Sequence, residues 1–362
     1  MALISQDGEF VKNFTLKQHR KNLAEAHHQK WVPISGAVDE AIEISETDGL
    51  SGIRMPWPKT HELFTFRPGS VSVLAGINGH GKSTVASQIM IHACTEICTG
   101  VMSLEMGLAD QLIMMTQQAI CRDGLTRDDI RRADDFLTGN AMWFYEHFGM
   151  MQIVEVYGAI WAAHQRGVKF LVIDNLQKCG LKYDADVERD FVGEIIGIAK
   201  ATQMHIVLVH HVRKPATGTE AYRPTKFDLK GSGSLSDQPD NLIIVWSNKR
   251  RKEIVDALHR GSAISQEDDN FLQDEVDYEV FIAKNRHARF EGKIRLYAGS
   301  GRTLKETEGD SELHIDLTLR PQSKDEADAV NQAPDDAGVN LEDFSWGGKS
   351  AANGSDFEIE EF

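Results

Sequence analysis

Residues 76–83 have the sequence Gly-Ile-Asn-Gly-His-Gly-Lys-Ser. This is the pattern G-x-x-x-x-G-K-[ST], whose glycines let backbone N–H groups wrap around a triphosphate at the start of a helix. The flanks agree, because the apolar run 71–75 predicts a buried strand and 84–90 predicts a helix. Lys82 is expected to reach the β- and γ-phosphates, and the Ser83 hydroxyl is expected to ligate Mg²⁺. The expected nucleotide-binding residues are Gly76, Asn78, Gly79, His80, Gly81, Lys82, Ser83 and Thr84.

Composition excludes several classes of protein. The chain has 362 residues, of which 41% are hydrophobic, which is enough for a sizeable core. Its apolar runs are too short to span a bilayer, and its first residues lack the pattern of a secretory signal. The four cysteines form no CxxC pair, which argues against a zinc site and suits a reducing compartment. We therefore expect a cytoplasmic protein with no membrane contact.

The net charge of −16 is distributed unevenly along the chain. Residues 323–362 contain eleven acidic residues and two lysines, with few large apolar side chains. Such a composition cannot offset the entropy lost on ordering, so residues 321–362 are expected to form a disordered acidic tail. Residues 1–35 are polar and basic in places, and they are expected to form an N-terminal arm. Net charge bears on solubility rather than on what a local basic segment binds.

Residues 36–320 are expected to form one α/β domain. Strand-like runs alternate with helix-like stretches, which is typical of a mostly parallel sheet covered by helices. The expected strands are 71–75, 99–104, 170–173, 206–209, 242–246, 280–283 and 293–298. The last two flank a polar turn and predict a β-hairpin at one edge of the sheet. The charged stretch 250–277 is expected to be a surface loop.

Two acidic residues lie at the ends of expected strands. Asp174 follows the buried run 170–173, where a carboxylate orients Mg²⁺ in phosphate-loop proteins. Glu105 follows the run 99–104, where it can polarise the water that attacks the γ-phosphate; a surface glutamate is the alternative interpretation. Ligands bind at the carboxyl edge of open α/β sheets, so both acids are expected beside the phosphate loop.

Polar and basic residues follow a third strand, 206–209. A polar side chain there, such as His211, can sense the γ-phosphate and pass its state to the next loop; a structural histidine is the alternative. The segment 213–235 is basic and contains glycines, which suits contact with a nucleic-acid backbone, although it also fits an ordinary solvated loop. Lys284 and Arg286 end the next-to-last strand, where surface charge is the default interpretation.

Together these segments resemble the DnaB-like replicative helicases, which are hexameric motors with a RecA-like fold, and in particular their phage helicase and Twinkle branch. The resemblance covers roughly residues 50–300. It rests on eight segments in the family's order: PWP at 56–58, FRPG at 66–69, AGINGHGKST at 75–84, SLEM at 103–106, LVIDNL at 171–176, LVHHVRK at 208–214, DLKGSGSL at 228–235 and AKNR at 283–286.

The resemblance implies roles for individual residues. Glu105 would be the catalytic carboxylate, and Asp174 would hold Mg²⁺ together with the phosphate loop. His211 would sense the γ-phosphate. Arg286 would act on the nucleotide of the neighbouring subunit, with Lys284 as its partner. The implied DNA-binding residues are Arg213, Lys214, Lys230, Gly231 and Ser232.

The function implied by the resemblance is an ATP-dependent DNA helicase. It would be a homohexamer that moves 5′→3′ on single-stranded DNA and unwinds forked duplexes, with ATP or dTTP as substrate. The resemblance implies a motor without a fused primase, acting in the bacterial cytoplasm if the chain is phage-encoded. The alternatives are a RecA- or RadA-like recombinase and a non-motor helicase loader. A GTPase is disfavoured, because Asn248 and Lys249 lack the Asp of the guanine-reading motif NKxD.

The end of the chain carries a further expectation. Residues 354–362 are acidic, with Phe357 and Phe362 among the few apolar side chains. They resemble the tails through which replication proteins dock onto partners, which would here be a polymerase, a primase or a single-strand-binding protein. A tail that only increases solubility is the alternative interpretation.

Overall fold

The computed structural model of the protein describes residues 34–47, 50–147, 149–181, 184–213, 222–231, 233–309 and 315–318. Two sheets are present, and their strands are β1 (Ile53–Arg54), β2 (Thr65–Phe66), β3 (Val71–Gly76), β4 (Thr99–Ser103), β5 (Met142–Tyr145), β6 (Phe170–Asp174), β7 (His205–His211), β8 (Asn241–Ser247), β9 (Tyr278–Asn285), β10 (Gly292–Ala298) and β11 (Leu304–Lys305). β1 and β2 form a small antiparallel pair. The other nine form one sheet in the order β11-β10-β9-β8-β3-β7-β6-β4-β5.

The large sheet is parallel over most of its width. The strands from β8 to β5 all run in one direction, whereas β9, β10 and β11 are antiparallel to their neighbours. This confirms the mostly parallel α/β sheet predicted from the alternating pattern. The 285–292 hairpin is also present, but β11 lies outside it, so the hairpin is not at the very edge as expected.

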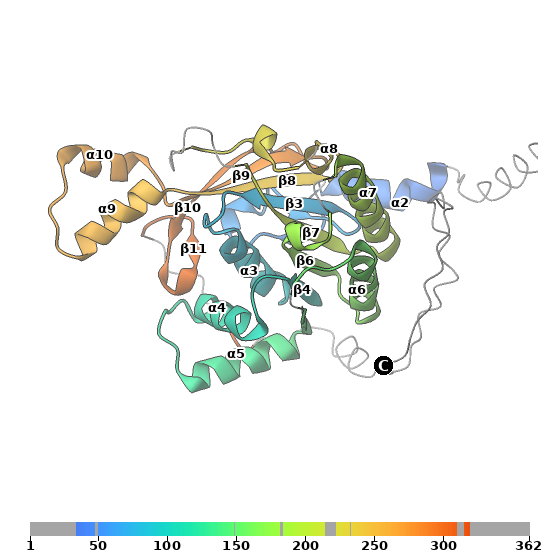
Figure 1. Ribbon diagram of the computed structural model, residues 1–362, viewed down its shortest axis with the longest axis horizontal. Helices are drawn as coiled ribbons and strands as arrows, with labels where there is room; N and C mark the ends of the chain where they lie inside the picture. Colours follow the sequence, from blue (N-terminus) through green and yellow to red (C-terminus); the bar gives the residue numbers. More distant parts are fainter. Residues whose placement is uncertain are drawn as a thin grey trace, which may run out of the picture.

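Helices cover both faces of the large sheet (Figure 1). The helices that pack on it are α3 (Lys82–Ala93), α4 (Leu108–Ile120) and α5 (Arg127–Gly139) on one face and α6 (Ile153–Gln165) and α7 (Ala185–Thr202) on the other. The other described helices are α2 (Val38–Glu46), α8 (Ser234–Asp237), α9 (Lys249–His259) and α10 (Gln266–Asp274), with short 3-10 turns at Ile34–Ala37, Pro58–Thr60, Leu176–Lys178, Lys226–Asp228 and Ser300–Arg302. Alternate residues of a strand face opposite sides. Thus Val73 packs in the core under α6 and α7, and Leu74 packs in the core under α3, α4 and α5.

Residues 250–277 were expected to be a surface loop, and this expectation was wrong. They contain most of α9 and all of α10, which project together from the C-terminal end of β8 (Figure 1). Each helix starts at a side-chain cap: Asn248 accepts from the N–H of Arg251, and Ser265 accepts from the N–H of Asp268. Ion pairs from Arg250 to Glu267 and Asp268 join the two helices, so polar residues hold them together.

The predicted arm and tail fall mostly outside the described residues. Of the arm 1–35, only residues 34 and 35 are described, in the turn Ile34–Ala37. The tail 321–362, with Phe357 and Phe362, lies wholly outside. Within the described part of the chain, no helix is long and apolar enough to cross a membrane.

Candidate functional site

The strand register brings the predicted site residues to one edge of the sheet. Gly76, at the end of β3, is level with His211 at the end of β7. Ser103, at the end of β4, is level with Asp174 at the end of β6. These strands are parallel neighbours, so the phosphate loop, the acid of β6 and the histidine of β7 share the edge where ligands bind in open α/β sheets.

The phosphate loop curls around the amine of Lys82. This amine donates to the carbonyl oxygens of Gly76 at 3.2 Å and Ile77 at 3.1 Å. Gly81 precedes α3 with a φ of 84°, and a Cβ there would lie 2.8 Å from the ring of Tyr278. Only glycine fits this position without strain. The N-terminus of α3 is therefore open to an anion, as the motif predicts.

Ser83 and Asp174 already contact each other. The Ser83 hydroxyl donates to Oδ2 of Asp174 at 2.7 Å. The pKa of Asp174 lies above its usual value, because burial raises it by more than this hydrogen bond lowers it. No cluster of three or more His, Cys, Asp or Glu residues that could hold a metal occurs among the described residues. A hydroxyl and one carboxylate fit Mg²⁺, which binds through a few protein oxygens together with substrate phosphates.

Glu105 lies just beyond β4 and is exposed. Its negative charge raises the pKa of both Lys82 and Asp174, so its carboxylate lies within electrostatic range of these two groups. The neighbouring Leu104 N–H donates to the carbonyl of Asp174 at 2.6 Å, which ties the end of β4 to the end of β6. The solvent-accessible carboxylate of Glu105 thus lies near the phosphate loop and Asp174.

The hydrogen bonds of His211 fix the tautomer of its ring. The side-chain oxygen of Asn175 accepts from the N–H of Gln177, so the Asn175 amide nitrogen is the donor to Nε2 of His211 at 3.0 Å. Burial, followed by the charge of Lys82, lowers the pKa of His211 to about 4. The neutral ring therefore carries its hydrogen on Nδ1, which is buried and has no partner among the described residues. A free N–H donor at this edge suits a phosphate oxygen.

The predicted DNA segment is attached directly to this histidine. Its neighbour His210 donates from Nε2 to the carbonyl of Lys230 at 2.5 Å, and the Lys230 N–H donates to the carbonyl of His211 at 3.1 Å. Arg213 donates to the carbonyl of Gly231 at 3.2 Å. Gly231 has a φ of 105°, and a Cβ there would collide with the carboxylate of Glu188. Lys214 and Ser232 lie outside the described residues.

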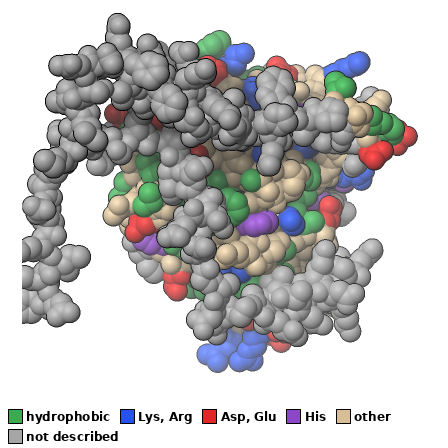
Figure 2. All heavy atoms as spheres, turned by 90° about the vertical axis from the view of Figure 1, so that its right-hand side faces the viewer, with side chains coloured by type: hydrophobic (Ala, Val, Ile, Leu, Met, Phe, Trp, Pro, Cys, Tyr) green, Lys and Arg blue, Asp and Glu red, His purple; other side chains and the backbone are tan. Residues whose placement is uncertain are grey.

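Lys284 and Arg286 lie away from this edge. β9 is antiparallel, so Asn285 is level with Asn241 at the start of β8, whereas Gly76 is level with Val245. The two levels are about 13 Å apart along the strands. Figure 2 views this opposite side of the molecule, where Lys or Arg and His side chains lie close together near the centre of the described surface. The chain therefore does not bring its own basic pair to its own phosphate loop.

The basic pair has partners within the chain. Arg286 contacts Asp240 at 3.0 Å, and the amine of Lys284 donates to the carbonyls of Ser236, Asp237 and Pro239. Burial raises the pKa of Asp240, but hydrogen bonds from His287 and the N–H of Val71, with the charge of Arg286, lower it to about 2. Asp240 is thus a carboxylate that holds the guanidinium in place.

Two contacts of the phosphate loop could not be inferred from the sequence. The His80 ring is buried, and its Nδ1 accepts from the N–H of Ser247 at 3.1 Å. Burial, then the charge of Lys249, lowers the pKa of His80 to about 4, so the ring is neutral. The amine of Lys249 donates to the carbonyl of Gly79 at 2.8 Å. Both contacts join the loop to the turn before α9, and only the fold reveals them.

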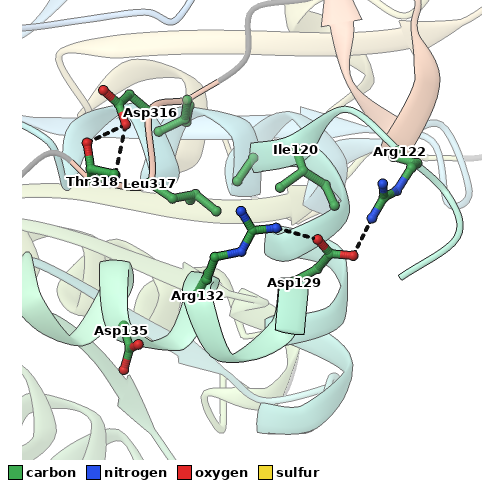
Figure 3. Close-up of a pocket in the computed structure, with 10 residues that line it drawn as sticks. Ile120, Arg122, Asp129, Arg132, Asp135, Asp316, Leu317 and Thr318 are labelled. Atoms are coloured by element: carbon green, nitrogen blue, oxygen red, sulfur yellow. Dashed lines mark hydrogen bonds and ion pairs between the residues drawn. The ribbon is translucent and has the colours of Figure 1, made fainter. Parts of the chain in front are cut away.

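Two cavities lie near α4. One, of about 740 Å³, adjoins the start of α3 and is lined by residues that include Thr84, Tyr278 and Tyr297. The other, of about 540 Å³, lies between α4, α5 and residues 315–318 (Figure 3). There Asp129 pairs with Arg122 and Arg132, so the charges that line it largely satisfy one another.

Lys82 gives the phosphate site a pH dependence. Burial lowers the pKa of its amine to about 8, although the charges of Asp174 and Glu105 raise it. A bound triphosphate favours the charged amine and raises this pKa, so binding takes up a proton above pH 8. We expect nucleotide affinity to fall about tenfold per pH unit above that value, and the titration of Lys82 to leave the affinity independent of pH below it. Titration with a fluorescent ATP analogue from pH 7 to 10 measures this.

The matched control for this titration is Lys82→Arg. A guanidinium keeps its charge over the whole range, so the slope above pH 8 should disappear even if the affinity is lower. Equal slopes in the two proteins would assign the titration to another group.

The chain is similar to known helicase domains. The family model described as "DnaB-like helicase C terminal domain" matches residues 61–301. Among solved structures, one described as an "ATPase Domain" matches with a TM-score of 0.61 and 16% identity, over 76% of this chain and 99% of that one. "The Structure Of A DnaB-Like Replicative Helicase And Its Interactions With Primase" matches with a TM-score of 0.58 and 15% identity, over 83% and 74%. At identities this low, the solved structures support only the RecA-like fold, whereas membership of the family rests on the family model.

Proposed function

We propose, because this chain belongs to the family of DnaB-like helicase C-terminal domains, that it is a replicative helicase powered by ATP or dTTP. It would assemble as a homohexamer, move 5′→3′ on single-stranded DNA and unwind the duplex at a fork. One observation carries the proposal: the edge that gathers Lys82, Asp174 and Glu105 also holds His211, whose backbone is bonded to the basic segment at Lys230. Hydrolysis and DNA contact are therefore linked through one strand.

The chemistry follows from the positions of these side chains. The loop N–H groups and Lys82 would bind the phosphates, and Ser83 and Asp174 would hold Mg²⁺, which neutralises charge on the γ-phosphate. Glu105 would take the proton of the attacking water. The Nδ1–H of His211 would donate to a γ-phosphate oxygen and lose this partner when phosphate leaves. The change would then reach Lys230 along β7.

Arg286 would complete the site of a neighbouring copy. It lies at the opposite end of the strands from its own phosphate loop, so the phosphate that it stabilises would belong to another subunit. Lys284 fixes the turn after α8 beside it. In this proposal the protein works in the cytoplasm, and its acidic tail, with Phe357 and Phe362, docks on a polymerase, a primase or a single-strand-binding protein.

Strand separation on a forked duplex tests the proposal. We expect unwinding of a fork with a 5′ single-stranded tail, with ATP and dTTP compared in parallel. A fork with only a 3′ tail and the Lys82→Ala protein are the controls, and both should stay annealed. Hydrolysis stimulated by DNA with no unwinding, together with strand exchange, would favour a recombinase. Hydrolysis with neither activity would favour a loader.

A further inference from the structure

Phe227 is an exposed aromatic side chain on the segment that follows β7. Its side chain is 83% exposed, and it is the one Phe, Tyr or Trp in the exposed class within the described part of the chain. Single exposed apolar residues are common and need no explanation in themselves. What distinguishes this ring is the way in which its segment is held and the charges around it.

The turn that carries the ring is held firmly. Thr225 caps the short helix Lys226–Asp228, and its N–H and hydroxyl both donate to Asp228, at 2.7 and 2.8 Å. Before the turn, Arg223 lies over the Trp246 ring at 4.3 Å and pairs with Glu279 at 3.2 Å. The ring is therefore presented to the solvent by fixed backbone, so little ordering entropy opposes binding.

After the turn, the chain returns to β7, the strand that ends in His211. Leu229 is buried and forms an antiparallel bridge with Val212, and the Arg213 N–H donates to the carbonyl of Asp228 at 2.7 Å. Phe227 is thus linked through two short backbone contacts to the strand that ends in His211. These contacts are a path by which a displacement of that strand would reach the ring.

One cation lies beside the ring, and two more are on the same segment. The amine of Lys226 lies 5.5 Å from the Phe227 ring centroid, and Arg213 and Lys230 are on the same bonded segment. Exposed aromatic rings beside basic groups bind single-stranded nucleic acid irrespective of sequence, because the cations contact phosphates and every base has a face that can stack. The same cations disfavour a basic partner.

We propose that Phe227 stacks on a base of the single-stranded DNA held by this segment. This rests on the proposed helicase function and adds a nucleobase contact to the backbone contacts of Arg213 and Lys230. This stacking contact is uncharged, so salt does not weaken it as it weakens the phosphate contacts. Because the ring is bonded through the backbone to β7, its position changes with the state of the phosphate site.

Binding to two oligonucleotides of equal length separates base contacts from backbone contacts. One is labelled oligo-dT, and the other is the same backbone with abasic sites. Anisotropy is measured with a non-hydrolysable ATP analogue and Mg²⁺. We expect Phe227→Ala to bind oligo-dT about 5- to 150-fold more weakly, and the abasic strand as the wild type does. Phe227→Trp should retain the affinity for oligo-dT.

Arg213→Ala is the matched contrast on the same segment. It should weaken binding to both oligonucleotides and reduce the slope of log affinity against log salt by about one, whereas Phe227→Ala should leave this slope unchanged. The two variants therefore differ in two independent readouts.

Three results would overturn the inference. If Phe227→Ala binds oligo-dT as the wild type does, no base stacks on the ring. If both oligonucleotides lose affinity equally and the oligomer dissociates in sedimentation, the ring packs on a neighbouring copy instead. If the wild type binds neither oligonucleotide, the helicase function fails, and the inference fails with it.

Discussion

Replacement of Arg286 by alanine is expected to lower DNA-stimulated ATP turnover by about 10³–10⁵-fold, while nucleotide affinity stays close to that of the wild type. The guanidinium would stabilise charge that develops on the γ-phosphate of a neighbouring subunit, and among the described lysines and arginines Arg286 alone forms an ion pair with Asp240. The measurements are steady-state hydrolysis with single-stranded DNA and binding of a fluorescent ATP analogue. Arg289→Ala, an exposed change in the same turn, is the control and should be active.

Mixing two inactive variants tests whether Arg286 acts between subunits. Lys82→Ala removes the phosphate contact but keeps Arg286, and Arg286→Ala does the reverse. In rings mixed at random from equal amounts, about a quarter of the contacts pair an intact phosphate loop with an intact arginine, so activity should return. No recovery in rings shown to be mixed would place the effect of Arg286 within its own chain, through Asp240.

Replacement of Glu105 by glutamine is expected to lower the rate of hydrolysis by about 10²–10⁴-fold without loss of nucleotide binding. Glutamine keeps the size of the side chain but cannot accept the proton of the attacking water. Single-turnover hydrolysis in preassembled rings measures the chemical step, and fluorescence titration measures affinity. Asp110→Asn, in the first turn of α4, is the control, because it removes a nearby charge without removing the base. Hydrolysis at the wild-type rate in Glu105→Gln would leave this residue as a surface glutamate.

The sequence predicts the parts of the site that depend on local pattern. The phosphate loop sits between a strand and a helix, and the runs before Asp174 and His211 are apolar enough to be identified as buried strands. Parallel strands share their carboxyl edge, so these residues could be placed together without knowledge of the strand order. The hairpin that carries Lys284 could also be predicted from local pattern, because its two strands flank one polar turn.

Other parts depend on tertiary structure. The ring of His80 and the amine of Lys249 meet backbone groups of distant segments, and no spacing in the sequence indicates such a contact. β5 (Met142–Tyr145) could not be predicted, although all four of its residues are apolar or aromatic, because a run of four residues shows no periodicity that separates a strand from a buried helix end. The segment of α9 and α10 resembles a loop in sequence because charged residues dominate it, although Asn248 and Ser265 are capping signals. The exposure of Phe227 cannot be predicted from the sequence, because it depends on how the folded chain packs.

The direction of β9 has a consequence for assembly. A sheet with the phosphate loop at one edge and Arg286 at the other gives each chain two unlike ends. If Arg286 serves its neighbour, as we propose, such chains join head to tail, and every contact completes one site. An open row then holds one complete site fewer than it has chains, and only closure makes the two numbers equal. If the ring opened at one contact to admit a DNA strand that has no free end, only the nucleotide site at that contact would lose its arginine. The other sites would stay complete.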